Sequence, residues 1–249
     1  MQELAVKRDR RGLLIGAAMF ASAYIGLRWW NSRPEPAVFE LFDGLPGFRQ
    51  VAGGKVSTGA FNPLVGLEAS DDPVPPIALK NLCGALFSEG TGPGVPVAFF
   101  TDYFCPYCRV MSKFLADSNA RGDIVLTVHE MPVLNDDSEV AARAALAAAG
   151  QGAYEALNRR LMRSRFVPDT SYLIKMAESA GLDAPRLLRE MNSEEVSDQL
   201  RLSKSVAARF GFFATPSLVI GRTVVVGSLS EERLALLVEQ EVADPGDVC

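Results

Sequence analysis

The fold of this chain is decided by the stretch Phe104-Cys105-Pro106-Tyr107-Cys108. An apolar run at 95–100 leads into it and predicts a short buried strand, and the pattern at 109–116 predicts a helix that leads out. Two thiols separated by two residues at a strand-to-helix turn can close a small disulfide ring and reopen it. The first thiol is expected where unpaired helix N–H groups and the helix dipole favour a thiolate. The stretch therefore predicts a redox-active dithiol.

The length and charge of the chain limit its class. The 249 residues are enough for one large domain or two small ones. Residues 1–33 carry six Lys or Arg and two acidic residues, a net charge of +4, so the rest of the chain carries −9 of the total of −5. Because proteins that bind nucleic acid need a basic surface, this acidic body indicates that nucleic acid is not a partner.

The basic N-terminus leads into an apolar segment. Residues 12–27 carry no charge, and the 19 residues from 12 to 30 reach roughly the 30 Å of a bilayer core at about 1.5 Å each. The basic cluster at 7–11 and the pair Trp29-Trp30 fit the positive-inside rule and an aromatic interfacial belt. We therefore expect a transmembrane helix at 1–33 as a signal anchor.

Two alternatives to an anchor remain open. A cleaved signal peptide is one, because Ala21-Ser22-Ala23 fits a cleavage site and Arg10-Arg11 loosely fits a twin-arginine signal. A buried helix of a soluble protein is the other. An anchor or a cleaved signal both place the body outside the cytoplasm. In a bacterium we expect a single-pass protein of the inner (cytoplasmic) membrane with its catalytic domain in the periplasm, or a soluble periplasmic protein after cleavage.

The region at 34–92 is rich in Gly and Pro and has weak periodicity. Within it, 37–45 is compatible with a short helix and 48–56 with a strand pair around Gly53-Gly54. We expect an extension or linker packed on the main domain. A short tail at 244–249 ends the chain.

Clear periodicity begins near residue 95. The pattern predicts strands at 97–100, 124–129, 217–220 and 223–226, and helices at 105–117, 139–149, 153–163, 171–180, 184–191, 193–210 and 230–239. Ser138 and Ser193 are plausible N-caps, as is Ser230 for the last helix. This is the α/β order of a thioredoxin-like fold at 93–243, with an all-helical subdomain inserted at about 137–205.

Residues from about 95 to 241 resemble the DsbA-type thiol–disulfide oxidoreductases, a thioredoxin-fold family with a helical insertion. The resemblance lies in 100–108, in Ser138 with the alanine-rich helix after it, in 180–183 and in 208–217. It implies that Cys105 is the attacking thiol and Cys108 the resolving thiol. It also implies that Pro106 and Tyr107 tune the redox potential. Without it, an inert disulfide or two core cysteines remain alternatives.

The resemblance also assigns the second active-site loop. It implies that Thr215-Pro216 is a cis-proline loop beside the cysteines, whose residue before the proline pairs with an extended substrate. Without the resemblance, Pro216 is an ordinary proline at the start of a strand. Ala214 departs from the family pattern, because a glycine is common at that position.

Other departures concern proton transfer. Many relatives have a buried carboxylate six residues before the first cysteine, where this chain has Phe99. Asp102 is nearer and is a candidate for proton handling, with capping of the turn as the alternative. Tyr107 replaces the histidine typical of the strongest oxidants. We expect His129 to be a structural or edge histidine.

Cys83 and Cys249 are isolated in the sequence. We expect them to form a structural disulfide, with free thiols as the alternative. A zinc site at Cys105 and Cys108 would need two further ligands, normally a second close pair, which the sequence lacks. We expect no metal and no cofactor.

These observations predict an extracytoplasmic enzyme that forms disulfides in unfolded or reduced secreted proteins. The resemblance implies reoxidation by a quinone-linked membrane partner of the DsbB type. A reductase or isomerase, serving cytochrome c maturation or disulfide correction, is the alternative. A non-enzymatic copper-binding assembly factor, with both cysteines as soft ligands, is a minor one.

Overall fold

The computed structural model describes residues 37–59, 75–87, 92–164 and 169–246, together with Met19, Ser22–Tyr24, Gly26 and Arg28. The chain divides into two units, Met1–Pro36 and Ala37–Cys249. The described residues of the first unit are helical. Among the residues that can be described, no helix is both long and apolar enough to cross a bilayer. Most of the expected anchor at 1–33 lies outside the described residues, so the anchor stays a prediction.

The second unit is built on a six-stranded sheet with the order β1-β2-β6-β5-β3-β4. The pair β3–β4 is parallel, β3–β5 and β5–β6 are antiparallel, and β2 joins β6 in parallel. The strands are β1 (Glu40–Leu41), β2 (Arg49–Ala52), β3 (Val95–Thr101), β4 (Ile124–Glu130), β5 (Ser217–Ile220) and β6 (Thr223–Val226).

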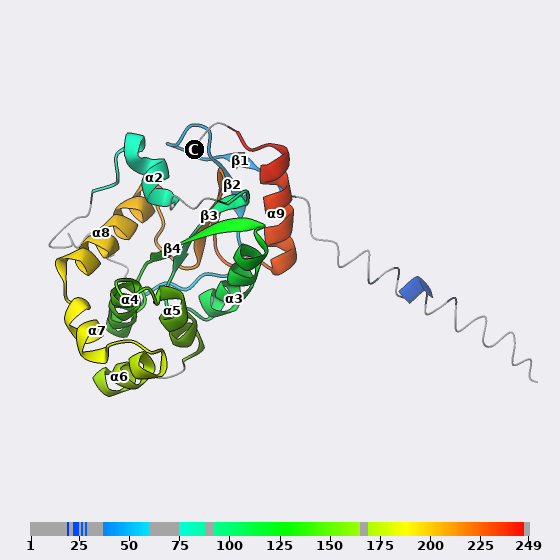
Figure 1. Ribbon diagram of the computed structural model, residues 1–249. Coiled ribbons are helices and arrows are strands. Elements are labelled where there is room, and N and C mark those ends of the chain that lie inside the picture. Colours follow the sequence, from blue (N-terminus) through cyan, green and yellow to red (C-terminus); the bar gives the residue numbers. More distant parts are fainter. Residues whose placement is uncertain are drawn as a thin grey trace, which may run out of the picture. The chain divides into compact units, whose positions relative to one another are not determined.

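Helices cover both faces of this sheet, with α3 and α9 on one side and α2 and α8 on the other (Figure 1). Side chains alternate along β3, so Val97 and Phe99 face α3 and α9, whereas Ala98 and Phe100 face α2 and α8. The helices of these two layers are α3 (Pro106–Arg121), α9 (Glu231–Ala243), α2 (Leu82–Leu86), preceded by the 3-10 turn η1 (Leu79–Asn81), and α8 (Glu194–Arg209).

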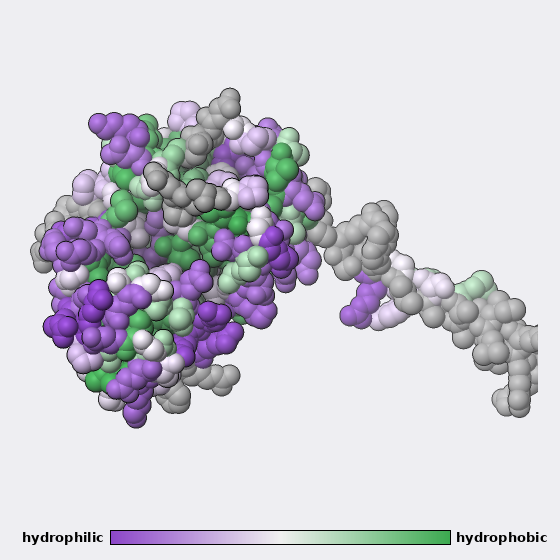
Figure 2. All heavy atoms as spheres, viewed as in Figure 1, coloured by the Kyte–Doolittle hydropathy of each residue, from purple (hydrophilic) through white to green (hydrophobic). Residues whose placement is uncertain are grey.

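The remaining helices form a third hydrophobic core beside the sheet (Figure 1). They are α4 (Asp136–Ala149), α5 (Tyr154–Arg163), α6 (Thr170–Ser179) and α7 (Ala184–Glu190). Six buried alanines of α4 allow its neighbours to pack closely, and the first half of α8 completes this core. Figure 2 shows mostly hydrophilic residues over the outer sides of α6 and α7. The predicted helical insertion in a thioredoxin-like fold is confirmed.

Two predictions for the N-terminal region are wrong. Residues 37–45 contain β1 and a turn instead of a helix, and positive φ angles at Gly44 and Gly47 shape the connection to β2. The segment 48–56 is not a strand pair around Gly53-Gly54, because β2 pairs with β1 and β6 instead. Sheet pairing over a long sequence separation overrides weak local propensity here.

The cap of α4 also differs from the prediction. Asn135 is the N-cap, and its side chain accepts a hydrogen bond from the Ser138 N–H. The Ser138 hydroxyl instead donates to Asp102 over 2.9 Å. The predicted caps Ser193 and Ser230 are confirmed.

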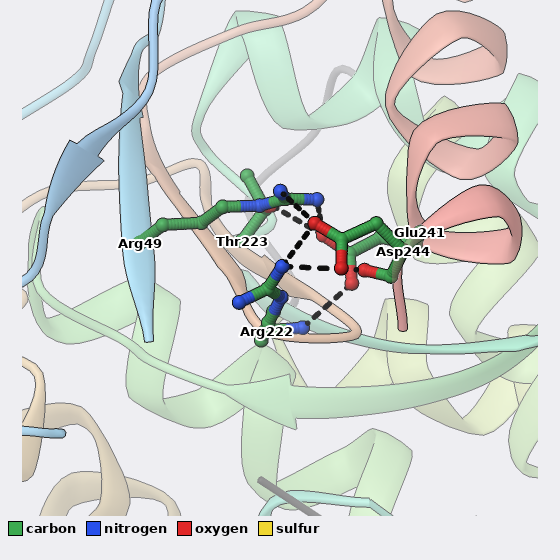
Figure 3. Close-up of polar contacts among 5 residues, drawn as sticks. All are labelled: Arg49, Arg222, Thr223, Glu241 and Asp244. Atoms are coloured by element: carbon green, nitrogen blue, oxygen red, sulfur yellow. Dashed lines mark hydrogen bonds and ion pairs between the residues drawn. The ribbon is translucent and has the colours of Figure 1, made fainter. Parts of the chain in front are cut away.

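A buried ion pair fixes β2 to the C-terminal part of the domain (Figure 3). Arg49 Nη2 lies 2.7 Å from Glu241 Oε1, and Arg49 Nε donates to Thr223 Oγ1 over 2.9 Å. Glu241 Oε2 accepts from the backbone N–H of Arg222, and both arginines pair with the exposed Asp244. The strand β2 is therefore an integral part of the sheet.

Candidate active site

Cys105 is the N-cap of α3. Its sulfur accepts a hydrogen bond of 3.1 Å from the backbone N–H of Cys108, in the way that a serine or aspartate oxygen caps other helices. Pro106 occupies the first helical position, where its missing N–H leaves no bond unmade. Both cysteines are free thiols and fully buried. The predicted location of the dithiol at the start of the helix is confirmed.

The two thiols differ strongly in acidity. The Cys108 thiol hydrogen-bonds to the Cys105 sulfur and is the largest cause that lowers the pKa of Cys105, to about 6. Ser57 and the backbone N–H of Cys108 also lower this pKa, while burial opposes them. Burial raises the pKa of Cys108 far above its ordinary value. At neutral pH the reduced pair therefore holds one thiolate, on Cys105, and one thiol.

The second active-site loop lies against the first cysteine. The Thr215-Pro216 peptide bond is cis, as predicted. The carbonyl oxygen of Thr215 lies 3.5 Å from the Cys105 sulfur and accepts a hydrogen bond from the protonated thiol. Ala214 is fully buried, and its carbonyl accepts a hydrogen bond from the Ser217 hydroxyl.

Asp102 holds the turn before the cysteines. Its Oδ1 accepts from the Phe104 N–H over 2.8 Å and from the Ser138 hydroxyl. Its Oδ2 accepts from the N–H groups of Val133 and Leu134 over 3.0 and 3.2 Å. These bonds tie the active-site turn to the segment after β4. Capping of the turn is visible in the structure, whereas proton handling by Asp102 stays a prediction.

Two further residues singled out in the sequence, His129 and Cys83, lie in β4 and α2, outside the two loops that form the dithiol site. His129, on the edge strand β4, is buried; its Nδ1 lies near the Ser203 hydroxyl and its Nε2 near the Leu86 carbonyl. Burial lowers its pKa, which fits the structural role expected for it. Cys83 lies in α2. Cys249 lies outside the described residues, so the pairing of Cys83 with Cys249 stays a prediction.

Sequence reasoning missed two groups at the site. Ser57, from the N-terminal extension, pairs with Thr215 through backbone hydrogen bonds, and no local pattern marks it. Glu130, at the end of β4, is buried and accepts hydrogen bonds of 2.6 Å from the hydroxyls of Tyr103 and Tyr154. Burial raises the pKa of Glu130 to about 7. A charged residue at the end of an apolar strand was the available signal for Glu130.

Comparison with known proteins assigns the family. Residues 96–239, more than half of the chain, match the model of the DSBA-like thioredoxin domain. The chain belongs to this family of thiol–disulfide oxidoreductases. As a DSBA-like domain it is a protein thiol–disulfide oxidoreductase, with Cys105 and Cys108 as the Cys-x-x-Cys pair.

Individual proteins are similar to this chain in sequence or in fold. The DSBA-like chain is similar to a thioredoxin-like oxidoreductase from Silicibacter pomeroyi DSS-3, at 33% identity and a TM-score of 0.57, covering 64% of this chain and 97% of that one. The catalytic domain of Proteus mirabilis ScsC shares the fold at 22% identity and a TM-score of 0.60, covering 67% and 97%. An uncharacterized protein of Haemophilus influenzae is 26% identical over 138 residues, 53% of this chain and 59% of that relative.

The DSBA-like site carries the groups that thiol exchange needs. Within the parts of the chain that the structure describes, no three His, Cys, Asp or Glu side chains gather closely enough to hold a metal ion. Its chemical resources are a thiolate at a helix start, a buried second thiol and a backbone edge at Thr215. A thiolate and a neighbouring thiol can form, break and transfer a disulfide bond.

Proposed function

We propose that this DSBA-like protein forms disulfides in reduced secreted proteins outside the cytoplasm. The observation that carries the proposal is the position of the Cys105 sulfur at the start of α3, where the Cys108 thiol and backbone N–H lower its pKa to about 6. A thiolate that is stable at neutral pH stabilises the reduced dithiol, and this makes the Cys105–Cys108 disulfide a stronger oxidant.

The reaction proceeds by two exchanges. A substrate thiolate attacks the Cys105 sulfur of the Cys105–Cys108 disulfide, the S–S bond breaks, and Cys108 leaves with the electron pair and takes up a proton. A second substrate thiolate then attacks the substrate sulfur of the mixed disulfide, and Cys105 leaves as a thiolate. The substrate loses two electrons and gains a disulfide, and the enzyme is left as the reduced dithiol.

The surroundings of the site suit an unfolded substrate. Phe213, two residues before Thr215, is 69% exposed, and Val110, two residues after Cys108, is 67% exposed. A contiguous exposed apolar surface is typical of sites that bind other proteins, and these two side chains lie close in sequence to the cis-proline loop and to the cysteines. Exposed apolar segments of an unfolded chain can pack against them.

The cellular setting is also part of the proposal. The uncharged segment at 12–27, preceded by the basic cluster at 7–11 and followed by Trp29-Trp30, supports a single-pass anchor in the inner membrane with the domain in the periplasm. A quinone-linked membrane protein of the DsbB type would reoxidise the dithiol by accepting its two electrons.

The reduction potential of the Cys105–Cys108 pair tests the direction of electron flow. Equilibration of the full-length protein with glutathione buffers should give a potential close to the oxidising end of the thioredoxin-fold range, about −120 mV. A value near about −270 mV would instead assign the protein to the reductases. Cys105→Ser is the matched control, because it cannot form the disulfide.

A further inference from the structure

A short segment of the N-terminal extension crosses the active site. It consists of residues 53–59 and is called the strap below. At its start, the Gly54 N–H donates to the Ser228 carbonyl over 2.8 Å, and Lys55 and Ser228 exchange hydrogen bonds of 2.9 and 3.0 Å. At its end, Gly59 lies so close to the Val133 carbonyl that a Cβ on it would approach that oxygen to 2.5 Å. The strap therefore runs from the end of β6 to the segment after β4.

The middle of the strap pairs with the cis-proline loop. The Ser57 N–H donates to the Thr215 carbonyl over 2.7 Å, and the Thr215 N–H donates to the Ser57 carbonyl over 3.0 Å. These two bonds form an isolated antiparallel bridge. The same Thr215 carbonyl oxygen lies 3.5 Å from the Cys105 sulfur. Ser57 is thus bound at the edge directly beside the reactive sulfur.

An extended peptide that adds to the edge at Thr215 would bind the Thr215 N–H and carbonyl, the two groups that Ser57 already binds. Strand addition needs a free N–H and a free carbonyl on the receiving residue. The Thr215 N–H already donates to Ser57, and Cys105 is fully buried. A substrate that binds at Thr215 and brings a thiol to Cys105 must therefore take the place of Ser57.

We propose that Val56–Thr58 is an internal occupant of a peptide-binding edge at Thr215, and that an extended segment of a protein substrate binds there by displacing it. That the displacing partner is a protein substrate rests on the proposed function. That the strap limits access to Cys105 does not depend on it.

The strap is held much less firmly than the strand that precedes it. β2 is fixed through the buried pair of Arg49 with Glu241. In the strap, Gly54, Lys55, Val56 and Thr58 are exposed, and only Gly53, Ser57 and Gly59 are half-buried. A segment with few buried apolar contacts opens at low free energy. The strap can therefore leave while the sheet stays intact.

Displacement also changes the chemistry of Cys105. Ser57 is one of the groups that lower the pKa of this thiol. While the strap is in place, Ser57 stabilises the Cys105 thiolate, and the sulfur is buried from solvent. When the strap leaves, the thiolate becomes accessible and loses one hydrogen-bonding partner, which makes it more basic and more nucleophilic.

Alkylation of Cys105 in the reduced full-length protein tests the proposal without any substrate. A maleimide carried on a long polyethylene glycol chain is the bulky probe and iodoacetamide the small one, with modified peptides identified by mass spectrometry. Ser57→Pro removes the N–H donated to Thr215 and should speed reaction with the bulky probe about tenfold. Equal rates for wild type and Ser57→Pro with the bulky probe would overturn the proposal.

Two matched variants separate the causes. Among the described residues the Thr58 N–H donates no hydrogen bond, so Thr58→Pro introduces a proline next to Ser57 without breaking the bridge and should react like wild type. Ser57→Ala keeps the backbone bridge and removes the hydroxyl, so its rate should change only through the Cys105 pKa. Acceleration of the same size in Thr58→Pro would show general loosening and contradict displacement at Thr215.

Hydrogen exchange provides a second test that needs no strap variant. A Cys108→Ser protein is joined through Cys105 to a model cysteine peptide as a stable mixed disulfide. The Ser57 amide should lose protection in this adduct while the Thr215 amide stays protected by the peptide. A Ser57 amide that keeps its protection in the adduct contradicts the proposal. If no adduct forms, the proposed function is in doubt, and the alkylation rates alone decide the role of the strap.

Discussion

The sulfur of Cys105 lies 3.5 Å from the carbonyl oxygen of Thr215, a residue 110 positions later in the chain. The contact joins the start of α3 to the cis-proline loop before β5. It places the reactive sulfur beside a backbone edge that can pair with an extended chain. Under the proposed function, a substrate that displaces Ser57 from this edge would present its own sulfur to Cys105, so that thiol exchange and peptide binding would share one site.

Alkylation of the reduced protein should depend on pH through Cys105. The pKa of this thiol is lowered to about 6, so its rate with iodoacetamide should rise as pH increases through about 6 and level off by neutrality. Cys108 should not react, because burial raises its pKa. Stopped reactions from pH 4 to 8, followed by peptide mass spectrometry, give the profile. A midpoint near the ordinary thiol pKa of about 8.5 would contradict the stabilised thiolate.

Glu130 should make stability fall with rising pH. Burial raises its pKa in the folded state to about 7, so between its unfolded pKa of about 4.3 and 7 the folded state binds a proton that the unfolded state has lost. The contribution is full below that window and is lost as pH rises through 7. The free energy of unfolding of wild type relative to Glu130→Gln should therefore decrease across the window, by at most about 1.4 kcal/mol per pH unit. Urea unfolding at several pH values measures it, and a flat difference would contradict the raised pKa.

Asp102 should matter first for stability. It is 1% exposed and accepts four hydrogen bonds, three of them from backbone N–H groups. Asp102→Asn places an amide donor against these donors and should lower the free energy of unfolding by about 3 kcal/mol, whereas Ser138→Ala removes one bond and should cost about 1 kcal/mol. Thermal unfolding of both variants provides the comparison. An Asp102→Asn protein with unchanged stability but slowed release of Cys108 would favour proton handling instead.

Cys83 and Cys249 should be joined in the oxidised protein. Without reductant, a digest should contain one cross-linked peptide with both cysteines, and this peptide should separate into two on reduction. Cys83→Ser should leave Cys249 open to alkylation without reductant. A wild-type protein in which both cysteines are alkylated without reductant would show the free-thiol alternative to be correct.

The helices and strands from β3 onward could be predicted because their signals are local. A strand, Cys-x-x-Cys and a helix follow one another within 27 residues, from Val95 to Arg121. Caps such as Ser193 and Ser230 form hydrogen bonds three residues away. Such short-range preferences are visible in any window of the sequence. The N-terminal extension lacks them, and its elements were predicted wrongly.

The sequence by itself determined the dithiol, the thioredoxin-like order of elements and the helical insertion, because these depend on residue types and spacings close together in the chain. Only the tertiary structure decided what surrounds Cys105. The Cys105 sulfur contacts Thr215, which lies 110 positions later in the sequence. Ser57, which precedes the Cys-x-x-Cys stretch in the sequence, pairs with the same residue. Backbone hydrogen bonds of this kind carry no residue signature, because every residue except proline has the same N–H and carbonyl. Chain folding alone brings them to the reactive sulfur.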